Sequence, residues 1–456
     1  MVNSDELQPL PLTAAGRYLI LAAAFLGWMF SGVQMSLMNL AARSATMELA
    51  RAGALDDSSA LSWRRLVPGF EPRPASSAEG SDLERLVTAQ TPRWFARFNS
   101  AFLLGAACGG LVFGWVGDRC GRVRAMGLSI VWYSLFAGAA YFAATPEQLL
   151  LLRFVSALGV GGMWPAAVSL ASEAWPDVSR PMLSGLIGTS ANVGIALMGG
   201  LAMIRDVAPE SWRWILLVGA APVVVGVLVW CVVPESPHWL AARAHPEAAE
   251  RSLPLSAVFR PPLLRLTLLG IALGAIPLLG GWGVTAWLIA WSDQALGAAD
   301  PGAKALTSIM RAGGGALGSL LGGWLADLCG RRKSYFLISL TTLGLSEWIY
   351  FRIAPADAWF APLVFVVGFV STIFFGWLPL YLPELFPTEA RATGTGVSFN
   401  FGRILTAAGV LGTGALTSAF GGDYAAAGRV TSLVYALGML VILFAPDTTG
   451  RKLGTG

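Results

Sequence analysis

One short polar block occurs twice in the chain, as GWVGDRCGRVR at Gly114–Arg124 and as GWLADLCGRRK at Gly323–Lys333. The matched positions, which include Asp118 and Asp327, are separated by one constant interval close to half of the chain length. Each copy follows a Gly-rich apolar stretch and precedes another apolar stretch. A charged turn that recurs at half-chain spacing in a very apolar chain indicates an internally duplicated membrane protein.

The composition supports a membrane protein. Apolar residues make up 55% of the chain and charged residues 13%, whereas a soluble chain carries about 25% charged residues. The net charge of +4 is small and spread over the polar segments, so we expect no nucleic acid partner. The four Cys lie in or beside apolar segments, and the two His share one polar loop. We therefore expect no disulfide framework, no metal site and no cofactor.

Twelve stretches are long and apolar enough to cross a bilayer, which requires about 20 residues each. Lipid offers no water to open backbone groups, so each stretch is expected to be a helix. The predicted spans are 18–41, 97–117, 124–143, 148–172, 182–204, 212–233, 264–291, 304–326, 334–353, 360–382, 392–418 and 428–446. The first is too long for the core of a cleaved signal peptide, so it is predicted to be retained. We predict an all-α membrane protein with twelve transmembrane helices in two pseudo-symmetric six-helix bundles.

The distribution of Lys and Arg predicts the orientation. Basic residues are more frequent in the short segments on the side of the N-terminus than in the short segments on the other side, which places both termini in the cytoplasm. The predicted parts are a cytoplasmic N-terminus (1–17), an N-terminal bundle (18–233) with a long outer loop (42–96), a cytoplasmic linker (234–263), a C-terminal bundle (264–446) and a cytoplasmic tail (447–456). The predicted location is the plasma (inner) membrane.

A second duplicated set lies near the ends of the fourth and tenth spans. Glu173/Glu384, Pro176/Pro387, Arg180/Arg391 and Gly185/Gly396 are all separated by one interval. Asp118 ends a predicted helix, where the helix dipole disfavours a carboxylate, so it needs Arg122 or a helix N-terminus of the other bundle as a partner. We predict a gating set at the cytoplasmic face. Its members are Asp118, Arg122, Glu173, Arg180, Asp327, Arg331, Glu384 and Arg391. The alternative interpretation is solvated turns whose arginines only set topology.

The chain resembles the major facilitator superfamily over nearly its whole length. DRCGR and DLCGR resemble the family motif that follows helices 2 and 8. PESPHWL at Pro234–Leu240, PELFPTEARATGTG at Pro383–Gly396 and PDTTGRKL at Pro446–Leu453 resemble signatures of the sugar-porter and organic-acid-porter branch. The resemblance implies the major facilitator fold, with two bundles that rock around a central site, usually with proton coupling. The stretch GGWGVTAWLIAW at Gly280–Trp291 resembles organic-acid porters more than sugar porters.

The predicted substrate site is built around one arginine. Charged residues inside spans are costly and usually functional, and Arg403 lies well inside the span 392–418. Its repeat equivalent is Asn192. Because an arginine fork suits a carboxylate, we predict that Arg403 binds a carboxylate substrate. The other predicted substrate-binding residues are Asn192, Trp164, Trp282, Gln34 and Asn400.

Two further residues are candidates for proton coupling. Glu347 is a carboxylate deep inside the span 334–353, and Arg153 begins the span 148–172 and resembles the arginine of a family motif. The alternatives are a structural role for Glu347 and an interface anchor for Arg153. The first span has Ser31 and Gln34 where organic-acid porters often carry Asp.

These features together predict a secondary active transporter rather than an enzyme. The expected substrate is a small organic solute, with a carboxylate metabolite favoured, and the expected mechanism is alternating access with proton symport. The expected partners are the solute, protons and the lipid bilayer, and a monomer is expected. The alternatives are a sugar or polyol porter and a non-transporting membrane sensor that keeps the carrier fold.

Overall fold

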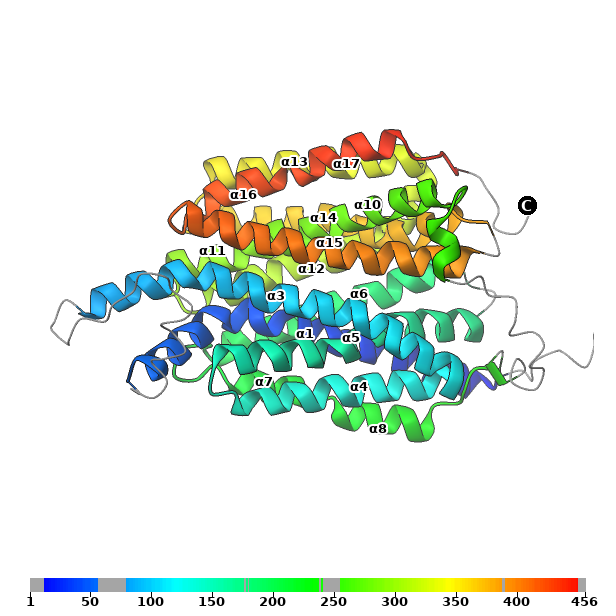
Figure 1. The fold of residues 1–456 in the computed structure, drawn as a ribbon, viewed down its shortest axis with the longest axis horizontal. Coiled ribbons are helices and arrows are strands. Elements are labelled where there is room, and N and C mark those ends of the chain that lie inside the picture. Colours follow the sequence, from blue (N-terminus) through cyan, green and yellow to red (C-terminus); the bar gives the residue numbers. More distant parts are fainter. Residues whose placement is uncertain are drawn as a thin grey trace, which may run out of the picture.

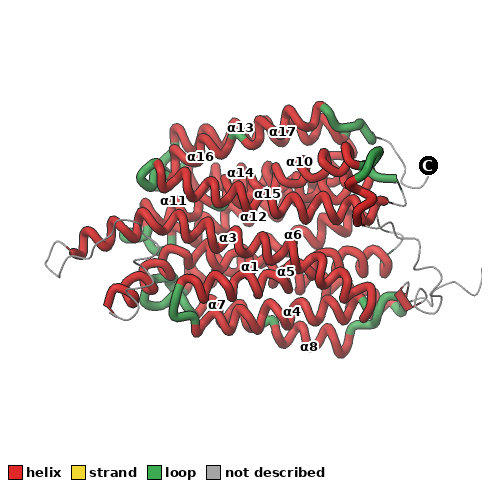
Figure 2. The backbone as a smooth tube through the Cα atoms, viewed as in Figure 1, coloured by secondary structure: helices red, strands yellow, loops and turns green. Residues whose placement is uncertain are grey.

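The computed structural model describes residues 12–55, 79–175, 178, 180–237, 239–240, 255–387 and 390–449. Within these ranges the chain is almost entirely helical and contains no strand (Figures 1 and 2). Each of the twelve predicted spans coincides with a helix or with two consecutive helices. The prediction of an all-α fold is confirmed.

The first half of the chain supplies six spans. Five are single helices and the sixth is interrupted at Pro222. Their bounds are α1 (Ala14–Leu55), α3 (Glu79–Cys120), α4 (Arg122–Ala139), α5 (Pro146–Ala174), α6 (Arg180–Ile204), and α7 (Trp214–Ala220) with α8 (Val223–Val232). A short 3-10 turn, η2 (Ala140–Phe142), extends α4.

The second half repeats this plan. Its first span consists of α10 (Leu264–Gly280), the π-helical turn η5 (Gly281–Thr285) and α11 (Trp287–Leu296), and a 3-10 turn, η4 (Leu255–Phe259), precedes it. The remaining bounds are α12 (Ala303–Cys329), α13 (Arg331–Arg352), α14 (Phe360–Glu384), α15 (Arg391–Ala419), and α16 (Tyr424–Ser432) with α17 (Val434–Leu443).

Most of these helices can cross a membrane by length and composition alone. Nine spans in the described part of the chain are long and apolar enough to do so. The other three helices, α12, α13 and α15, fall short because they are richer in charged residues or in Gly, Ser and Thr. These three helices pack against other helices of the bundles. α12 lies against α14 and α6, α15 lies against α3 and α10, and α13 lies against α14 and α17.

The helices form two bundles that meet along two long contacts. Figure 1 shows the helices of the first half below those of the second half, with α3 beside α15 and α6 beside α12 at the boundary. Each bundle has its own buried apolar cluster. A further cluster joins them, because Trp94 and Phe95 of α3 pack in it together with Trp287 of α11.

Two helices extend into the segment that the sequence predicts as an outer loop. α1 continues to Leu55 and α3 already begins at Glu79, so only part of 42–96 is left as a connection. The helices continue because their extensions keep an apolar face. Leu49 and Trp94 are 3% and 2% exposed and pack in the cluster that contains Trp212.

Candidate functional site

Both copies of the repeated block form the same sharp turn between two helices. Gly121 joins α3 to α4 with φ 111° and Gly330 joins α12 to α13 with φ 83°. A residue with a Cβ atom is strained in this backbone region, so both positions favour Gly. The turns lie at the right-hand end of the molecule in Figure 1, near the C-terminus. We call this end of the two bundles the motif end, and the other the opposite end.

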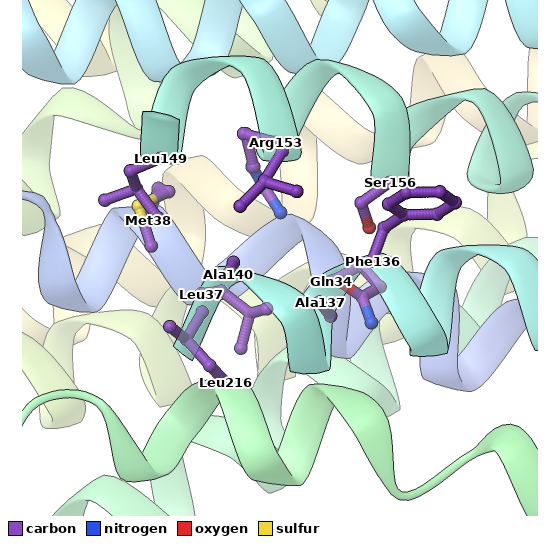
Figure 3. Close-up of a pocket in the computed structure, with 11 residues that line it drawn as sticks. Gln34, Leu37, Met38, Phe136, Ala137, Ala140, Leu149, Arg153, Ser156 and Leu216 are labelled. Carbon is purple, nitrogen blue, oxygen red and sulfur yellow. The ribbon is translucent and has the colours of Figure 1, made fainter. Parts of the chain in front are cut away.

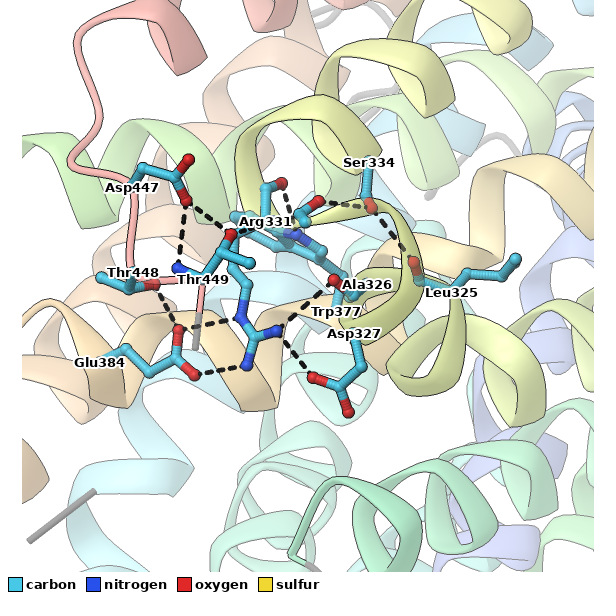
Figure 4. Close-up of polar contacts among 11 residues, drawn as sticks. Leu325, Ala326, Asp327, Arg331, Ser334, Trp377, Glu384, Asp447, Thr448 and Thr449 are labelled. Carbon is cyan, nitrogen blue, oxygen red and sulfur yellow. Dashed lines mark hydrogen bonds and ion pairs between the residues drawn. The ribbon is translucent and has the colours of Figure 1, made fainter. Parts of the chain in front are cut away.

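A buried arginine organises the motif end of the C-terminal bundle (Figure 4). Arg331, the first residue of α13, is 6% exposed. Its Nη2 and Nε donate to the Glu384 carboxylate of α14 at 2.9 and 3.2 Å, and its Nη1 donates to Asp327 at 2.7 Å. Its carbonyl accepts from Trp377 Nε1 at 3.0 Å. A two-pronged bond from arginine to a carboxylate fixes orientation as well as distance.

The segment after α17 closes this cluster. The Thr448 hydroxyl donates to the Glu384 carboxylate, and Thr449 Oγ1 accepts from the Arg331 backbone N–H at 3.1 Å. Thr449 in turn donates to Asp447 at 2.6 Å. These hydrogen bonds from Thr449 hold the pKa of the Asp447 carboxyl below its usual range. The C-terminal signature therefore acts as a polar strap over the start of α13.

The N-terminal bundle has a matching cluster. Arg122, the first residue of α4, forms an ion pair with Glu173 of α5, and the Ser236 hydroxyl donates to the same carboxylate. Glu235 accepts from the backbone N–H groups of Arg122 and Val123 at 2.9 and 3.0 Å. An acidic side chain is favoured at this positive end of a helix dipole. The segment after α8 thus corresponds to the strap after α17.

The two clusters differ at the aspartate of the block. Asp327 is bonded to Arg331, whereas no ion pair between the side chains of Asp118 and Arg122 occurs in the described residues. Instead the Asp118 carbonyl accepts from Trp239 Nε1 at 2.8 Å. Asp118 and Arg122 still interact electrostatically across the turn, but their side chains do not form a close ion pair in this structure.

Six of the eight predicted gating residues lie in these two clusters, and each cluster lies within one bundle. Arg391 is half-buried at the start of α15, and the side chain of Arg180 at the start of α6 is outside the described part. Among the described residues, the ion pairs at the motif end join helices of the same bundle. In the part of the chain that the structure describes, the ion pairs of Arg122 and Arg331 stay within one bundle, so the salt-bridge set between bundles and its gating role stay a prediction.

Within the described ranges, the ion pair between the bundles lies at the opposite end and involves residues that the sequence analysis did not single out. The Asp293 carboxylate of α11 lies 3.2 Å from Lys304 Nζ of α12 and 3.9 Å from Arg43 Nη1 of α1. Lys304 also donates to the Val207 carbonyl of the N-terminal bundle at 2.8 Å, and Ser44 donates to the same oxygen at 2.8 Å. Asp293 and Lys304 are 6% and 4% exposed. The buried Asp293–Lys304 pair lies within the C-terminal bundle, and it contacts the N-terminal bundle through Arg43 and the Val207 carbonyl.

Three predicted substrate residues lie where the bundles touch. Arg403 of α15 is 7% exposed and donates to the Ala106 carbonyl of α3 at 3.2 Å and to Asn400 at 3.4 Å. Asn192 of α6 donates to the Ser319 hydroxyl of α12 at 3.4 Å. Arg403 and its repeat equivalent Asn192 thus occupy the two equivalent contacts, α3–α15 and α6–α12.

The predicted aromatic residues also group near this boundary. Trp164 of α5 lies 4.9 Å from Trp28 of α1, measured between ring centroids. Trp282 of η5 lies 5.3 Å from Phe102 of α3, so a ring of one bundle contacts a ring of the other. Gln34 lies apart, because its Nε2 donates to the Gly219 carbonyl of α7 at 2.7 Å within the N-terminal bundle.

The two candidates for proton coupling lie in different places. Glu347 is half-buried in α13, with Arg429 of α16 as its charged neighbour, so it belongs to the outer part of the C-terminal bundle. Arg153 is 4% exposed in α5, with its guanidinium 4.3 Å from the ring centre of Phe102. It lines a cavity inside the N-terminal bundle (Figure 3).

Known proteins resemble the chain along almost its full length. The family described as "Sugar (and other) transporter" matches residues 65–257 and 288–455. A cis,cis-muconate transport protein of Acinetobacter baylyi is 31% identical over 310 residues, which cover 66% of this chain and 73% of that protein. The "Probable 4-methylmuconolactone transporter" of Cupriavidus pinatubonensis is 30% identical over 355 residues, covering 76% and 80%.

A solved structure shows the same fold. The xylose transporter XylE from E. coli, in a partially occluded inward-open conformation, aligns with a TM-score of 0.70 over 96% of this chain and 100% of that chain, at 15% identity. Since the family match extends through both bundles, the chain belongs to the sugar (and other) transporters of the major facilitator superfamily and is a membrane transporter rather than an enzyme.

Proposed function

We propose that this transporter moves a small organic carboxylate across the bacterial inner membrane by alternating access. The observation that carries the mechanism is the distribution of ionic contacts. At the opposite end Arg43 of the N-terminal bundle pairs with Asp293, and Lys304 donates to the Val207 carbonyl, while the clusters of Arg331 and Arg122 brace each bundle internally at the motif end. If two rigid bundles rock against each other, the ionic contact at one end breaks and that end opens.

A carboxylate is the favoured substrate because a buried arginine lies at the bundle contact. Arg403 has a planar, permanently charged fork that matches a carboxylate, and in this structure it donates hydrogen bonds to a backbone carbonyl and an amide oxygen. An anionic substrate would offer stronger, charge-assisted bonds than these neutral acceptors. The relative named for cis,cis-muconate transports an organic acid anion, which agrees with this choice.

The proposed orientation has the motif end and both termini in the cytoplasm. The motif end carries a cluster of basic residues next to the spans, which is typical of cytoplasmic segments. These residues are Arg119, Arg122, Arg124, Arg331, Arg332 and Lys333. The structure then corresponds to a state that is closed by ionic contacts on the outer side. A monomer is sufficient for this mechanism, because both bundles belong to one chain.

Uptake into proteoliposomes tests the proposal. We expect purified protein to accumulate labelled cis,cis-muconate, and Arg403→Gln to lower the initial uptake rate by about tenfold or more, as loss of a charge-assisted bond to a carboxylate requires. The matched control is Arg352→Gln, which removes an exposed arginine at the end of α13, away from the bundle contact. Its uptake is expected to equal that of the wild type.

Other results of the uptake assay would support the alternative functions, a sugar porter or a sensor. Uptake of neutral sugars with no uptake of organic acids would make the chain a sugar porter, and ligand binding without uptake would make it a sensor. Equal rates for Arg403→Gln and wild type would remove Arg403 from the substrate site. An imposed inward proton gradient that accelerates accumulation supports symport, and an unchanged rate opposes it.

A further inference from the structure

Arg153 carries a buried positive charge that has no counter-charge among the residues that the structure describes. It is 4% exposed in the middle of the N-terminal bundle. Its Nε and Nη2 have no hydrogen-bond partner, and no carboxylate of the described residues lies within ion-pair distance. The face of Phe102 lies 4.3 Å from the guanidinium and offers only partial compensation. Arginine does not lose its proton in proteins, so the charge persists and is costly while it is unpaired.

The arginine borders a small, partly open cavity. The cavity lies between α1, α4, α5 and α7 and has room for a single water-sized body (Figure 3). Its walls are mostly apolar, with Leu37, Phe136 and Leu216 among them, and Arg153, Gln34 and Ser156 are the polar residues of its lining.

Neither polar neighbour supplies a negative charge. Gln34 is held by the bond from its Nε2 to the Gly219 carbonyl, and its Oε1 has no hydrogen-bond partner. The Ser156 hydroxyl donates to the Tyr133 carbonyl at 3.0 Å. A water molecule in the cavity would leave the charge uncompensated.

We propose that this cavity binds one monatomic anion, chloride in the cell, as the counter-ion of Arg153. A monatomic anion accepts the free N–H groups, cancels the charge and fits a space of this size, whereas an organic carboxylate brings its carbon skeleton with it. The site lies inside one bundle and is separate from Arg403 at the bundle contact. Its existence does not depend on the identity of the transported solute.

The melting temperature of the purified full-length protein in detergent, compared in chloride and in gluconate at equal ionic strength, tests this site. A ligand that binds the folded state raises the melting temperature. We expect a saturable rise of about 2 °C or more in chloride. Arg153→Met is expected to lose the rise and, in gluconate, to melt at or above the wild-type temperature, because removing an uncompensated buried charge does not destabilise the fold.

Two further variants keep the test decisive. Gln34→Glu places a fixed carboxylate in the cavity lining, so it is expected to lose the chloride dependence and to melt above wild type in gluconate. Arg119→Gln removes an exposed arginine that packs over Trp115, and it is expected to keep the full chloride effect. The proposal is overturned by an absent chloride effect in wild type, by an equal effect in wild type and Arg153→Met, or by an Arg153→Met protein that melts well below wild type in gluconate.

The position of the anion is checked by replacing chloride with bromide in crystals. An anomalous peak in the cavity beside Arg153 is the expected result. Bromide peaks elsewhere with none beside Arg153 would overturn the assignment. Stabilisation by small carboxylates but not by halides would also overturn it, and would place the solute at Arg153.

Discussion

At the scale of single residues, the most informative groups are the two arginines that begin α4 and α13. Arg122 and Arg331 each reach a glutamate of a helix far along the chain, Glu173 and Glu384 respectively. Each glutamate also accepts a hydrogen bond from a hydroxyl group of a nearby polar segment, Ser236 after α8 or Thr448 after α17. The charge of each carboxylate is therefore stabilised by an arginine and by a hydroxyl group. Loss of either partner leaves the carboxylate less well compensated in a weakly polar interior.

Removing one partner of the buried pair in the C-terminal bundle is expected to be severe. Arg331→Gln leaves the Glu384 carboxylate, whose side chain is only 2% exposed, without its cation. Breaking a buried pair in this way costs about 3–5 kcal/mol. We expect a marked fall in the melting temperature of the purified protein. Lys333→Gln, which removes an exposed cation two residues further on, is the control and is expected to melt like wild type.

The double variant separates pairing from simple loss of packing. Arg331→Met combined with Glu384→Met removes both charges and is expected to recover most of the lost stability, because apolar replacement of a buried pair is often neutral. A double variant as unstable as Arg331→Gln would contradict the view that the unpaired carboxylate causes the loss.

At the scale of elements, the tight helix–turn–helix at each repeated block sets how two spans pack. Gly330 ends α12 and also precedes the first residue of α13, with φ 83° and ψ 156°. This conformation is essentially restricted to glycine. The turn brings Arg331 directly under Trp377 and Glu384 of α14, so the backbone at one glycine determines the geometry of the ionic cluster.

A pair of glycine substitutions in neighbouring elements is expected to have opposite signs. Gly330→Ala forces a side chain into the strained region and is expected to destabilise the protein by about 1–3 kcal/mol. Gly344→Ala lies in the middle of α13, where an added methyl group meets no other atom within 4 Å. It is expected to stabilise by about 0.5–1 kcal/mol, since alanine favours helix. Thermal melting of both variants checks this, and equal effects of the same sign would contradict the argument.

At the scale of the whole molecule, the two bundles are held by different forces at their two ends. The long contacts α3–α15 and α6–α12 run through the boundary, and in the described residues the ion pair that crosses it, Arg43–Asp293, lies at the opposite end. Asp293 is central there, because both Lys304 and Arg43 face its carboxylate. A rocking motion that opens this end must separate Lys304 from Val207 and Arg43 from Asp293.

Weakening this contact is expected to shift the conformational equilibrium. Asp293→Ala removes the carboxylate shared by both cations, so the state open at the opposite end gains population. We expect a thiol placed by Ala305→Cys, a fully buried position of α12, to react about tenfold faster with a polar maleimide in a variant lacking the native cysteines. A factor of ten corresponds to about 1.4 kcal/mol.

The control for this experiment lies at the same end but within one bundle. Glu48 of α1 pairs with Arg213 at 3.4 Å, and both belong to the N-terminal bundle. Glu48→Gln removes that pair without touching the boundary, so its maleimide rate is expected to match the parent protein. A faster rate in Glu48→Gln than in Asp293→Ala would show that local loosening explains the reactivity.

The hydrophobic pattern was sufficient to predict the helices, because a bilayer permits few alternatives to a helix for an apolar stretch. The ends of α1 and α3 were not predictable from it, since their extensions past the apolar core are stabilised by burial of residues such as Leu49 and Trp94. The segments after α8 and α17 stood out in the sequence as family signatures, but their equivalent role as straps was not predicted. Pro234-Glu235-Ser236 and Pro446-Asp447-Thr448 share chemistry rather than identity beyond the proline.

The sequence by itself determined the duplicated twelve-helix architecture, the family and the residues of the two repeated turns, because periodic hydrophobicity and a recurring Asp–Gly–Arg block are local properties of the chain. Only the tertiary structure decided which charges meet. It paired Arg331 with Glu384 inside one bundle, placed Asp293 between Lys304 and Arg43 across the boundary, and left Arg153 beside a cavity without a carboxylate. Electrostatic partners are set by distances of a few ångströms between helices that are remote in sequence, and no local pattern encodes those distances.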